Sequence, residues 1–133
     1  MTGSDVLFDT WAWWEYLHGT RTGESLRRRF VGPAGVHLHT SAISLAELAA
    51  KLAAEGSRNR IDPVCGSIRR ASRVWDVTAD LAVEGGIARA ELRRSTPSAS
   101  LADGIVFATA RRSGARIVSA DPAFRYVPGV ITR

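Results

Sequence analysis

The chain has 133 residues, of which 45% are hydrophobic and 23% are charged, a balance typical of a globular protein and not of a disordered one. This length suits one compact unit with its own core, so we expect residues 1–133 to form a single domain. The formal net charge of +5 favours an anionic partner such as nucleic acid, and the short apolar runs predict no membrane-spanning segment.

The first elements expected along the chain are a strand and two helices. Residues 6–8 are apolar and β-prone, and this strand ends at Asp9. A helix rich in aromatic residues follows at residues 11–17 and stops before Gly19. A second helix is expected over residues 23–30, before the turn sequence GPAG.

A second strand, over residues 36–43, leads into the helix with the clearest pattern. Ser44 is predicted to cap that helix, with Glu47 three residues later and leucines at helical spacing as far as Gly56. A further helix at residues 63–71 and a third strand at 73–78 follow.

The last third of the chain is predicted to hold two more helices and a strand. Thr78 can cap a helix that runs to Arg93, and Ser100 can cap a helix that carries Asp103 in its first turn and stops at Gly114. A strand over residues 115–120 follows and leads to Asp121, and residues 129–132 could add a last short strand.

Short apolar strands that alternate with helices predict an α/β sandwich. We expect a central, mostly parallel sheet of four to five strands flanked by helices. Ligands of such sheets bind beyond the carboxyl ends of the strands, so the candidate site is expected at that edge.

Four acidic residues are predicted to meet at this edge. Two of them end strands and two lie at the starts of helices: Asp9, Asp121, Glu47 and Asp103. Clustered carboxylates repel one another unless a cation lies among them. Oxygen ligands without histidine or thiolate favour Mg²⁺ or Mn²⁺, which could activate water against a phosphodiester.

Each acid also has a purely structural explanation. Glu47 and Asp103 both fit the capping-box pattern, which stabilises a helix by about 1 kcal/mol. Glu47 could instead pair with Lys51, one helical turn later. Asp9 could cap the first helix, and Asp121 before Pro122 could initiate a turn. Capping and metal binding are compatible, since a helix N-terminus favours an ionised carboxylate.

Three segments resemble the successive acidic motifs of the PIN-domain family, in particular the VapC-type toxins of toxin–antitoxin pairs. They are VLFDTWAWWEYL, SAISLAELAAKL and SLADGIVFATARRSGARIVSADPAF, and the likeness extends over essentially the whole chain. The resemblance implies a cytoplasmic endoribonuclease that depends on Mg²⁺ or Mn²⁺. It also implies a homodimer that a small cognate antitoxin inhibits by filling the active site.

Matched by position, the resemblance assigns catalysis and metal binding to the four acids Asp9, Glu47, Asp103 and Asp121. Thr10, which follows the first acid, and Ser119, in the last motif, match its supporting positions. The chain departs from the common family pattern at Trp11, where many members have Ser or Asn. It departs again at Pro122 and Ala123, where some members carry a further acid.

Four other features of the sequence bear on function. His37 and His39 alternate on one strand and so share a face, but the sequence offers no third metal ligand. Trp11 and Trp14 are expected in the core, while Trp13 could face an interface or stack on a base. The arginine doublets could bind phosphate or form a solvated surface. Cys65, the only cysteine, has no disulfide or metal partner, which fits a reducing cytoplasm.

Two other functions remain open from the residues alone. A degenerate PIN-like module could bind RNA or a protein without cutting it. A phosphotransfer domain of the haloacid-dehalogenase or receiver type could use Asp9 as a nucleophile, but such sites need a second aspartate or a lysine nearby, and Lys51 is the only lysine.

Overall fold

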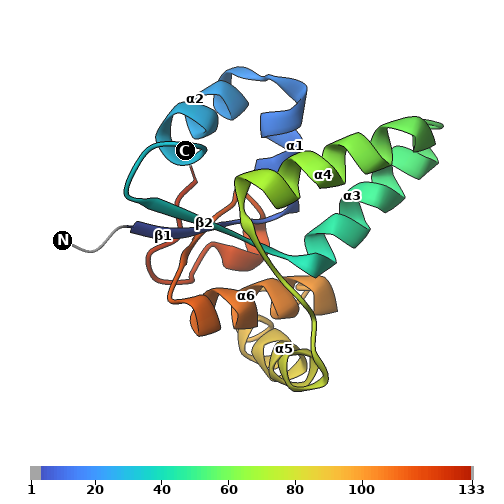
Figure 1. Cartoon of the computed structure of the whole chain (residues 1–133). Helices are drawn as coiled ribbons and strands as arrows, with labels where there is room; N and C mark the ends of the chain where they lie inside the picture. The colour runs from blue at the N-terminus through green and yellow to red at the C-terminus, as the bar shows by residue number, and fades with distance from the viewer. Residues whose placement is uncertain (1–3, 133) are drawn as a thin grey trace.

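The computed structural model describes residues 4–132, which fold into a parallel sheet covered by helices (Figure 1). The strands are β1 (Ser4–Phe8), β2 (Val36–Ser41), β3 (Arg73–Trp75) and β4 (Arg116–Val118), in the spatial order β3-β2-β1-β4. Every strand pair is parallel. Residues 129–132 add only an isolated bridge between Val118 and Ile131. The predicted α/β sandwich is therefore confirmed, with four strands.

Six α-helices and two short 3₁₀ helices connect and cover the strands. The α-helices are α1 (Thr10–His18), α2 (Arg21–Phe30), α3 (Ala42–Ala54), α4 (Ile61–Ala71), α5 (Ala79–Leu92) and α6 (Leu101–Ser113). The 3₁₀ turns are η1 (Arg58–Arg60) and η2 (Pro122–Phe124). Within residues 4–132 no helix combines the length and the apolarity that crossing a membrane requires.

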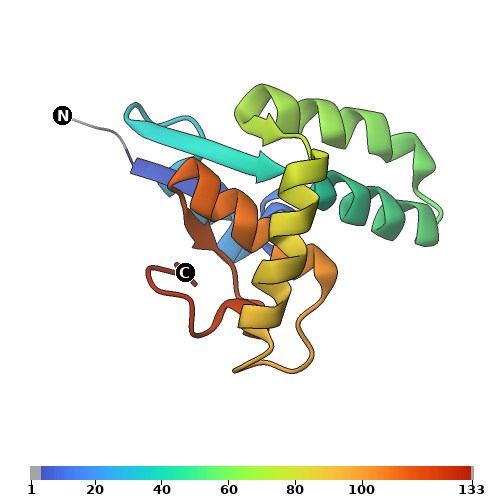
Figure 2. The ribbon, with the colours of Figure 1, turned by 90° about the horizontal axis from the view of Figure 1, so that it is seen from below.

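Two clusters of apolar side chains hold the layers together, one on each face of the sheet. Val6 and Phe8 of β1 face α1, α2 and α3, while Leu7 faces the opposite cluster of α5, α6 and β4. This alternation follows from the two-residue period of a strand. Figures 1 and 2 show α6 directly against the sheet, with α5 outside it.

The close approach of α5 and α6 depends on glycine. A Cβ atom on Gly104 would lie 2.2 Å from the backbone oxygen of Gly85, and one on Gly85 would lie 2.6 Å from Cγ1 of Ile105. Because real Cβ atoms do not approach that closely, larger residues would separate the helices. The sequence analysis did not predict that Gly85 and Gly104 are needed at this crossing, although a glycine inside a helix can indicate close packing.

Candidate functional site

Asp9 lies where β1 passes into α1, as predicted, and it is the most buried of the four acids. Its side chain is 5% exposed and caps α1, because Oδ1 accepts a hydrogen bond from the backbone N–H of Ala12 at 2.9 Å. The hydroxyl of Ser119, 110 positions later in the chain, donates a hydrogen bond to Oδ2 of Asp9. The carboxylate of Asp9 therefore both caps α1 and belongs to the candidate site.

Burial raises the pKa of Asp9 from its ordinary value of 3.8 to about 7. The negative charges of Asp121 and Glu47 act in the same direction, while the hydrogen bonds from Ser119 and Ala12 lower this pKa. Near neutral pH the carboxyl is therefore close to half protonated when no cation is bound. A cation beside it would favour the charged form.

Glu47 lies in the second turn of α3, so its predicted role in a capping box is wrong. The helix begins at Ala42, and its cap is Ser41, whose Oγ accepts from the backbone N–H of Ile43 at 3.3 Å. The carboxylate of Glu47 instead accepts a hydrogen bond from the hydroxyl of Thr10 at 2.6 Å. Helix capping therefore does not explain this acid.

Lys51 does not pair with Glu47 as the sequence suggested. Its Nζ lies 4.6 Å from the centre of the Trp14 ring, a cation–π contact. One oxygen of Glu47 is held instead by Thr10, the first residue of α1, which directly follows Asp9.

Asp103 forms the predicted capping box with Ser100. The backbone N–H of Ser100 donates to Oδ2 of Asp103 at 2.8 Å, and the backbone N–H of Asp103 donates to Oγ of Ser100 at 3.1 Å. The side chain is half-buried, and burial raises its pKa, with a further contribution from the charge of Asp121. The structural explanation for this acid is therefore correct, and one of its oxygens remains available.

Ser119 forms hydrogen bonds with both Asp9 and Asp121. Its Oγ donates to Asp9 and also accepts from the backbone N–H of Asp121 at 2.9 Å. Asp121 caps η2, since its Oδ1 accepts from the N–H of Ala123 at 2.8 Å, and it is exposed to solvent. The predicted supporting residues Thr10 and Ser119 thus each hold one of the acids.

Asp9 follows β1, Asp121 follows β4, Asp103 lies in the first turn of α6 and Glu47 in the second turn of α3. Their charges connect Asp9 with Asp121 and Glu47, and Asp121 with Asp103. Among residues 4–132, however, no three His, Cys, Asp or Glu side chains lie close enough to form a metal site as they stand. Side-chain rotation would be needed to bring three carboxylates onto one ion.

We predict that Ser119→Ala moves the pKa of Asp9 further upward, because this hydroxyl is the strongest hydrogen-bond donor that favours the charged carboxylate. An NMR titration of the Asp9 side-chain carboxyl measures this shift directly. Ser100→Ala, which removes the hydroxyl that caps α6 beside Asp103 and leaves the partners of Asp9 in place, is the matched control. An unchanged pKa of Asp9 in Ser119→Ala would show that the hydrogen bond from Ser119 does not stabilise the charged carboxylate.

Two buried polar groups lie near α3: Ser44, which was wrongly predicted to cap this helix, and Thr40, which the sequence analysis did not single out. Ser44 is fully buried, and its Oγ has no hydrogen-bond partner within the described residues. Thr40 accepts from Nε1 of Trp13 at 3.1 Å and bonds to Ser72 at 2.7 Å. No periodic pattern in the sequence marks Thr40 as a buried hydrogen-bonding residue, since its partners Trp13 and Ser72 are distant in the chain.

The prediction for Trp13 is wrong, while Trp11 and Trp14 do pack against the core, as partly buried residues. Trp13 is fully buried and packs edge-on against Phe8 at 5.0 Å between ring centres, whereas Trp11 and Trp14 are only half-buried. The helix starts at Thr10 and turns Trp13 toward the sheet, where the hydroxyl of Thr40 satisfies its indole N–H. Trp13 is therefore a core residue.

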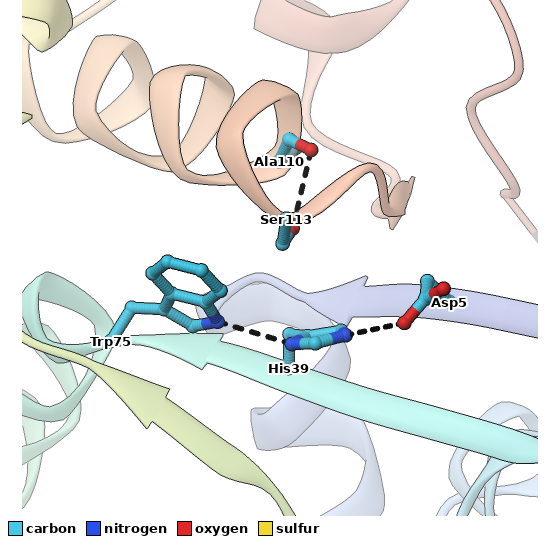
Figure 3. Close-up of polar contacts among 5 residues, drawn as sticks. All are labelled: Asp5, His39, Trp75, Ala110 and Ser113. Atoms are coloured by element: carbon cyan, nitrogen blue, oxygen red, sulfur yellow. Dashed lines mark hydrogen bonds and ion pairs between the residues drawn. The ribbon is translucent and has the colours of Figure 1, made fainter.

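Of the two predicted histidines, His39 belongs to a separate cluster on β1, β2 and β3 (Figure 3). Nε1 of Trp75 donates to Nδ1 of His39 at 3.0 Å, and Nε2 of His39 contacts Oδ1 of Asp5 at 2.8 Å. Since Nδ1 accepts, the proton of the neutral ring lies on Nε2 and donates to Asp5. His37 is exposed, and the pair forms no metal group within residues 4–132.

Several arginines of the doublets are paired with acids of the same chain. Arg27 pairs with Glu24, Arg111 with Glu91 and Arg112 with Glu84, all at exposed positions. Such pairs contribute little to stability. For these three side chains, the structure favours the solvated surface over the phosphate-binding site among the two predicted alternatives.

Comparison with known proteins gives one family. The PIN-domain model matches residues 6–130. No curated protein matches the sequence. Solved structures match over nearly the whole chain, each at low sequence identity.

Three of these structures illustrate the likeness. Mycobacterium tuberculosis VapC20, described as a sarcin-ricin loop cleaving toxin, has a TM-score of 0.75 at 22% identity, covering 96% of this chain and 98% of that one. A DNA-bound VapBC from Salmonella typhimurium has 0.71 at 20%, covering 98% and 96%. A toxin–antitoxin complex from Klebsiella pneumoniae has 0.69 at 20%, covering 96% of each chain. At these identities the likeness establishes the fold alone.

Proposed function

The chain belongs to the PIN-domain family, and from this premise we propose that residues 1–133 form one nuclease domain, a VapC-type toxin that hydrolyses RNA phosphodiester bonds in the cytoplasm. The observation that carries the proposal is the set of acids around Asp9. Four acids come from separate segments, and the charges of two of them add to the effect of burial in raising the pKa of Asp9. Perturbed carboxyls gathered at one edge are typical of a catalytic site.

The donor set fits Mg²⁺ or Mn²⁺. All four candidate ligands, Asp9, Glu47, Asp103 and Asp121, offer carboxylate oxygen, which these hard cations prefer. A bound cation of this kind would lower the pKa of water and stabilise charge on a phosphodiester. Attraction to the ion would then offset the burial, and the smaller repulsion from Asp121 and Glu47, that raise the pKa of Asp9.

The other polar residues of the site position these acids. Ser119 orients Asp9 and the backbone at Asp121, Thr10 holds one oxygen of Glu47, and Ser100 fixes the rotamer of Asp103. Each acid keeps its second oxygen, or a second lone pair, for a ligand. The supporting hydroxyls therefore restrain the acids before substrate binds.

The proposed partners are an RNA substrate, a cognate antitoxin and a second copy of the chain. The antitoxin is supported by solved structures of similar fold that are toxin–antitoxin or VapBC complexes. RNA is supported by the net charge of +5 and by the relative described as a sarcin-ricin loop cleaving toxin. In a cell, we expect expression of the chain to arrest growth and the antitoxin encoded beside it to relieve the arrest.

The proposal is tested by incubating the purified chain with structured RNA in Mg²⁺, Mn²⁺ or EDTA and mapping the products. Endonucleolytic fragments that form only with a divalent cation are expected. Cleavage that continues unchanged in EDTA would reject the metal-dependent reaction.

The alternative is a catalytically degenerate module that binds RNA or a protein. It is favoured by the separation of the acids, since no three within residues 4–132 stand at ligating distance. Calorimetric titration with Mn²⁺ separates the two functions. Divalent binding that disappears in Asp9→Asn supports the nuclease, and no binding at all supports the module.

A further inference from the structure

The first half of β2 has an open edge on the side of β3. β3 pairs with β2 only from His39 to Ser41, so no strand among the described residues covers residues 36–38 on that side. A groove with a volume of about 610 Å³ lies beside this edge, and its lining includes His37, Arg70 and Arg73. Figure 2 shows that α5 and α6 leave the start of β2 uncovered on their side of the sheet. This basic groove is therefore open to a ligand.

The charges in the basic groove are mostly positive and unneutralised. Arg70 and Arg73 are exposed, and neither forms an ion pair within residues 4–132, in contrast to the three paired arginines described above. Asp5 is the only acid among the described residues that line the groove, and its carboxylate contacts His39. The two free guanidinium groups, with the exposed His37 between β1 and the groove's rim, favour an anionic ligand.

Arg73 is positioned by an aromatic side chain that is itself held in place. The guanidinium carbon of Arg73 lies 4.0 Å from the centre of the Trp75 ring, and Nε1 of Trp75 donates to the buried His39 (Figure 3). Val74, between them, packs into the opposite hydrophobic cluster, so Arg73 and Trp75 share the face of the sheet that bears α6. A guanidinium restrained in this way loses less freedom when it binds a ligand.

The chemistry of the basic groove fits the phosphates of an RNA strand. A guanidinium can donate two parallel hydrogen bonds to phosphate oxygens, and Arg70 and Arg73 each have donors that no acid of the described chain occupies. The open edge of β2 spans only three residues, which is short for an added peptide strand. The charges therefore favour a polyanion over an extended peptide.

The basic groove is separate from the four acids. Asp5 and His37 are paired in register near the starts of β1 and β2, whereas Asp9 follows the end of β1. A strand rises by about 3.3 Å per residue, so the groove lies about 13 Å from Asp9 along the sheet. A phosphate bound there is not the one at the acids and belongs to another nucleotide of the same strand.

We propose that the basic groove formed by His37, Arg70 and Arg73 is a second RNA-binding subsite, which holds backbone phosphates at a distance from the acids. The inference rests on the RNA substrate of the proposed function, but it does not depend on cleavage. A strand long enough to reach both places binds more tightly than one that reaches only the acids. The groove thus sets a minimum length for a well-bound RNA.

Fluorescence anisotropy of a labelled single-stranded RNA, titrated with the full chain in EDTA, tests the proposal without cleavage. Arg70→Ala and Arg73→Ala are each expected to weaken binding about three- to tenfold and to reduce the dependence of log K on log salt concentration by about 0.7, the value of one phosphate contact. Arg69→Ala is the matched control. It removes the same charge from the preceding position of α4, but Arg69 does not line the groove, so both quantities should stay unchanged.

Two further variants separate the role of Trp75 from general damage. Trp75→Leu removes the ring beneath Arg73 and should weaken RNA binding about two- to fivefold, while Trp75→Phe keeps a ring and should restore most of it. Asp5→Asn removes the one acid of the described lining, keeps an oxygen for His39, and should bind RNA at least as tightly as the unaltered chain. Circular dichroism of each variant checks that it is folded.

The outcomes distinguish this subsite from the proposed reaction. RNA that binds the unaltered chain, Arg70→Ala and Arg73→Ala equally would overturn the subsite, as would an equal loss in Arg69→Ala, which would indicate diffuse attraction. Variants that lose an antitoxin but keep RNA would overturn it as well. RNA that needs the groove for binding but is not cut in Mg²⁺ would reject the reaction and leave the subsite in place.

Discussion

Replacing Asp9 by asparagine is expected to lower RNA cleavage in Mg²⁺ at least about a hundredfold while making the protein more stable at pH 8. Asparagine keeps the shape of the side chain and an oxygen that can accept the bond from Ala12. It removes the charge that a cation would bind. Loss of activity together with a gain in stability distinguishes a catalytic carboxylate from a structural one.

The gain in stability follows from the pKa of Asp9. In the folded chain this pKa is about 7, and in the unfolded chain it returns to about 3.8, so the folded state binds the proton more tightly. The resulting stabilisation is fully present below pH 4 and is lost as the pH rises to 7. Above pH 7 the charged, buried carboxylate costs up to about 4 kcal/mol relative to the protonated form, of which we expect asparagine to recover 1–3 kcal/mol.

Thermal unfolding of both proteins at pH 5 and pH 8, in EDTA and in Mg²⁺, checks this prediction. Asp9→Asn should unfold about 4–10 °C higher than the unaltered chain at pH 8 in EDTA, with a smaller difference at pH 5. Mg²⁺ should stabilise only the unaltered chain. Asp5→Asn, on the same strand but paired with His39, is the control and should still cleave. Full cleavage by Asp9→Asn would reject the assigned site.

The second large effect is expected at the crossing of α5 and α6. Gly104→Ala should lower the free energy of unfolding by about 1–3 kcal/mol, because the new methyl group would overlap the backbone oxygen of Gly85 and the nitrogen of Arg89. Neither is a flexible side-chain end, so a whole helix must move. Gly104 follows Asp103, so cleavage should fall as well.

Urea unfolding of Gly104→Ala and of Gly66→Ala makes the comparison. Gly66 lies in α4, where a Cβ would approach only the guanidinium of Arg70 at 3.3 Å. That substitution should be neutral or stabilise by about 0.5–1 kcal/mol, since alanine is the better helix former. Equal stability of Gly104→Ala and the unaltered chain would mean that the helices separate without cost.

Helix caps and strand ends made most of the fold predictable. Thr78 and Ser100 cap the helices predicted for them, and Gly19 and Gly114 adopt the left-handed conformation just past their helix ends. The start of α3 was misplaced because two serines stand within four residues. Which of the two serines caps α3 depends on where β2 ends in the folded sheet, and it ends at Ser41. The prediction for the buried Trp13 failed for a related reason, since Thr40, which accepts its indole N–H, lies on β2, 27 positions along the chain.

The candidate site was predictable in its residue types and not in its details. An acid after a strand can be placed at the sheet edge from topology alone, as Asp9 and Asp121 were. The contact of Thr10 with Glu47 spans 37 positions and leaves no local pattern. The unequal burial of the acids, and with it the raised pKa of Asp9, depends on how far each side chain lies from solvent. That quantity exists only in the folded chain.

The bond from Ser119 to Asp9 joins residues 110 positions apart, and the strands behind them, β4 and β1, pair directly. Closing so large a loop costs entropy that only late tertiary contacts repay, so a parallel pairing of this span forms slowly. Asp9 and Asp121 can come together only when that pairing is complete. A partly folded chain thus carries separated acids, so the proposed site is assembled only after this last parallel pairing has formed.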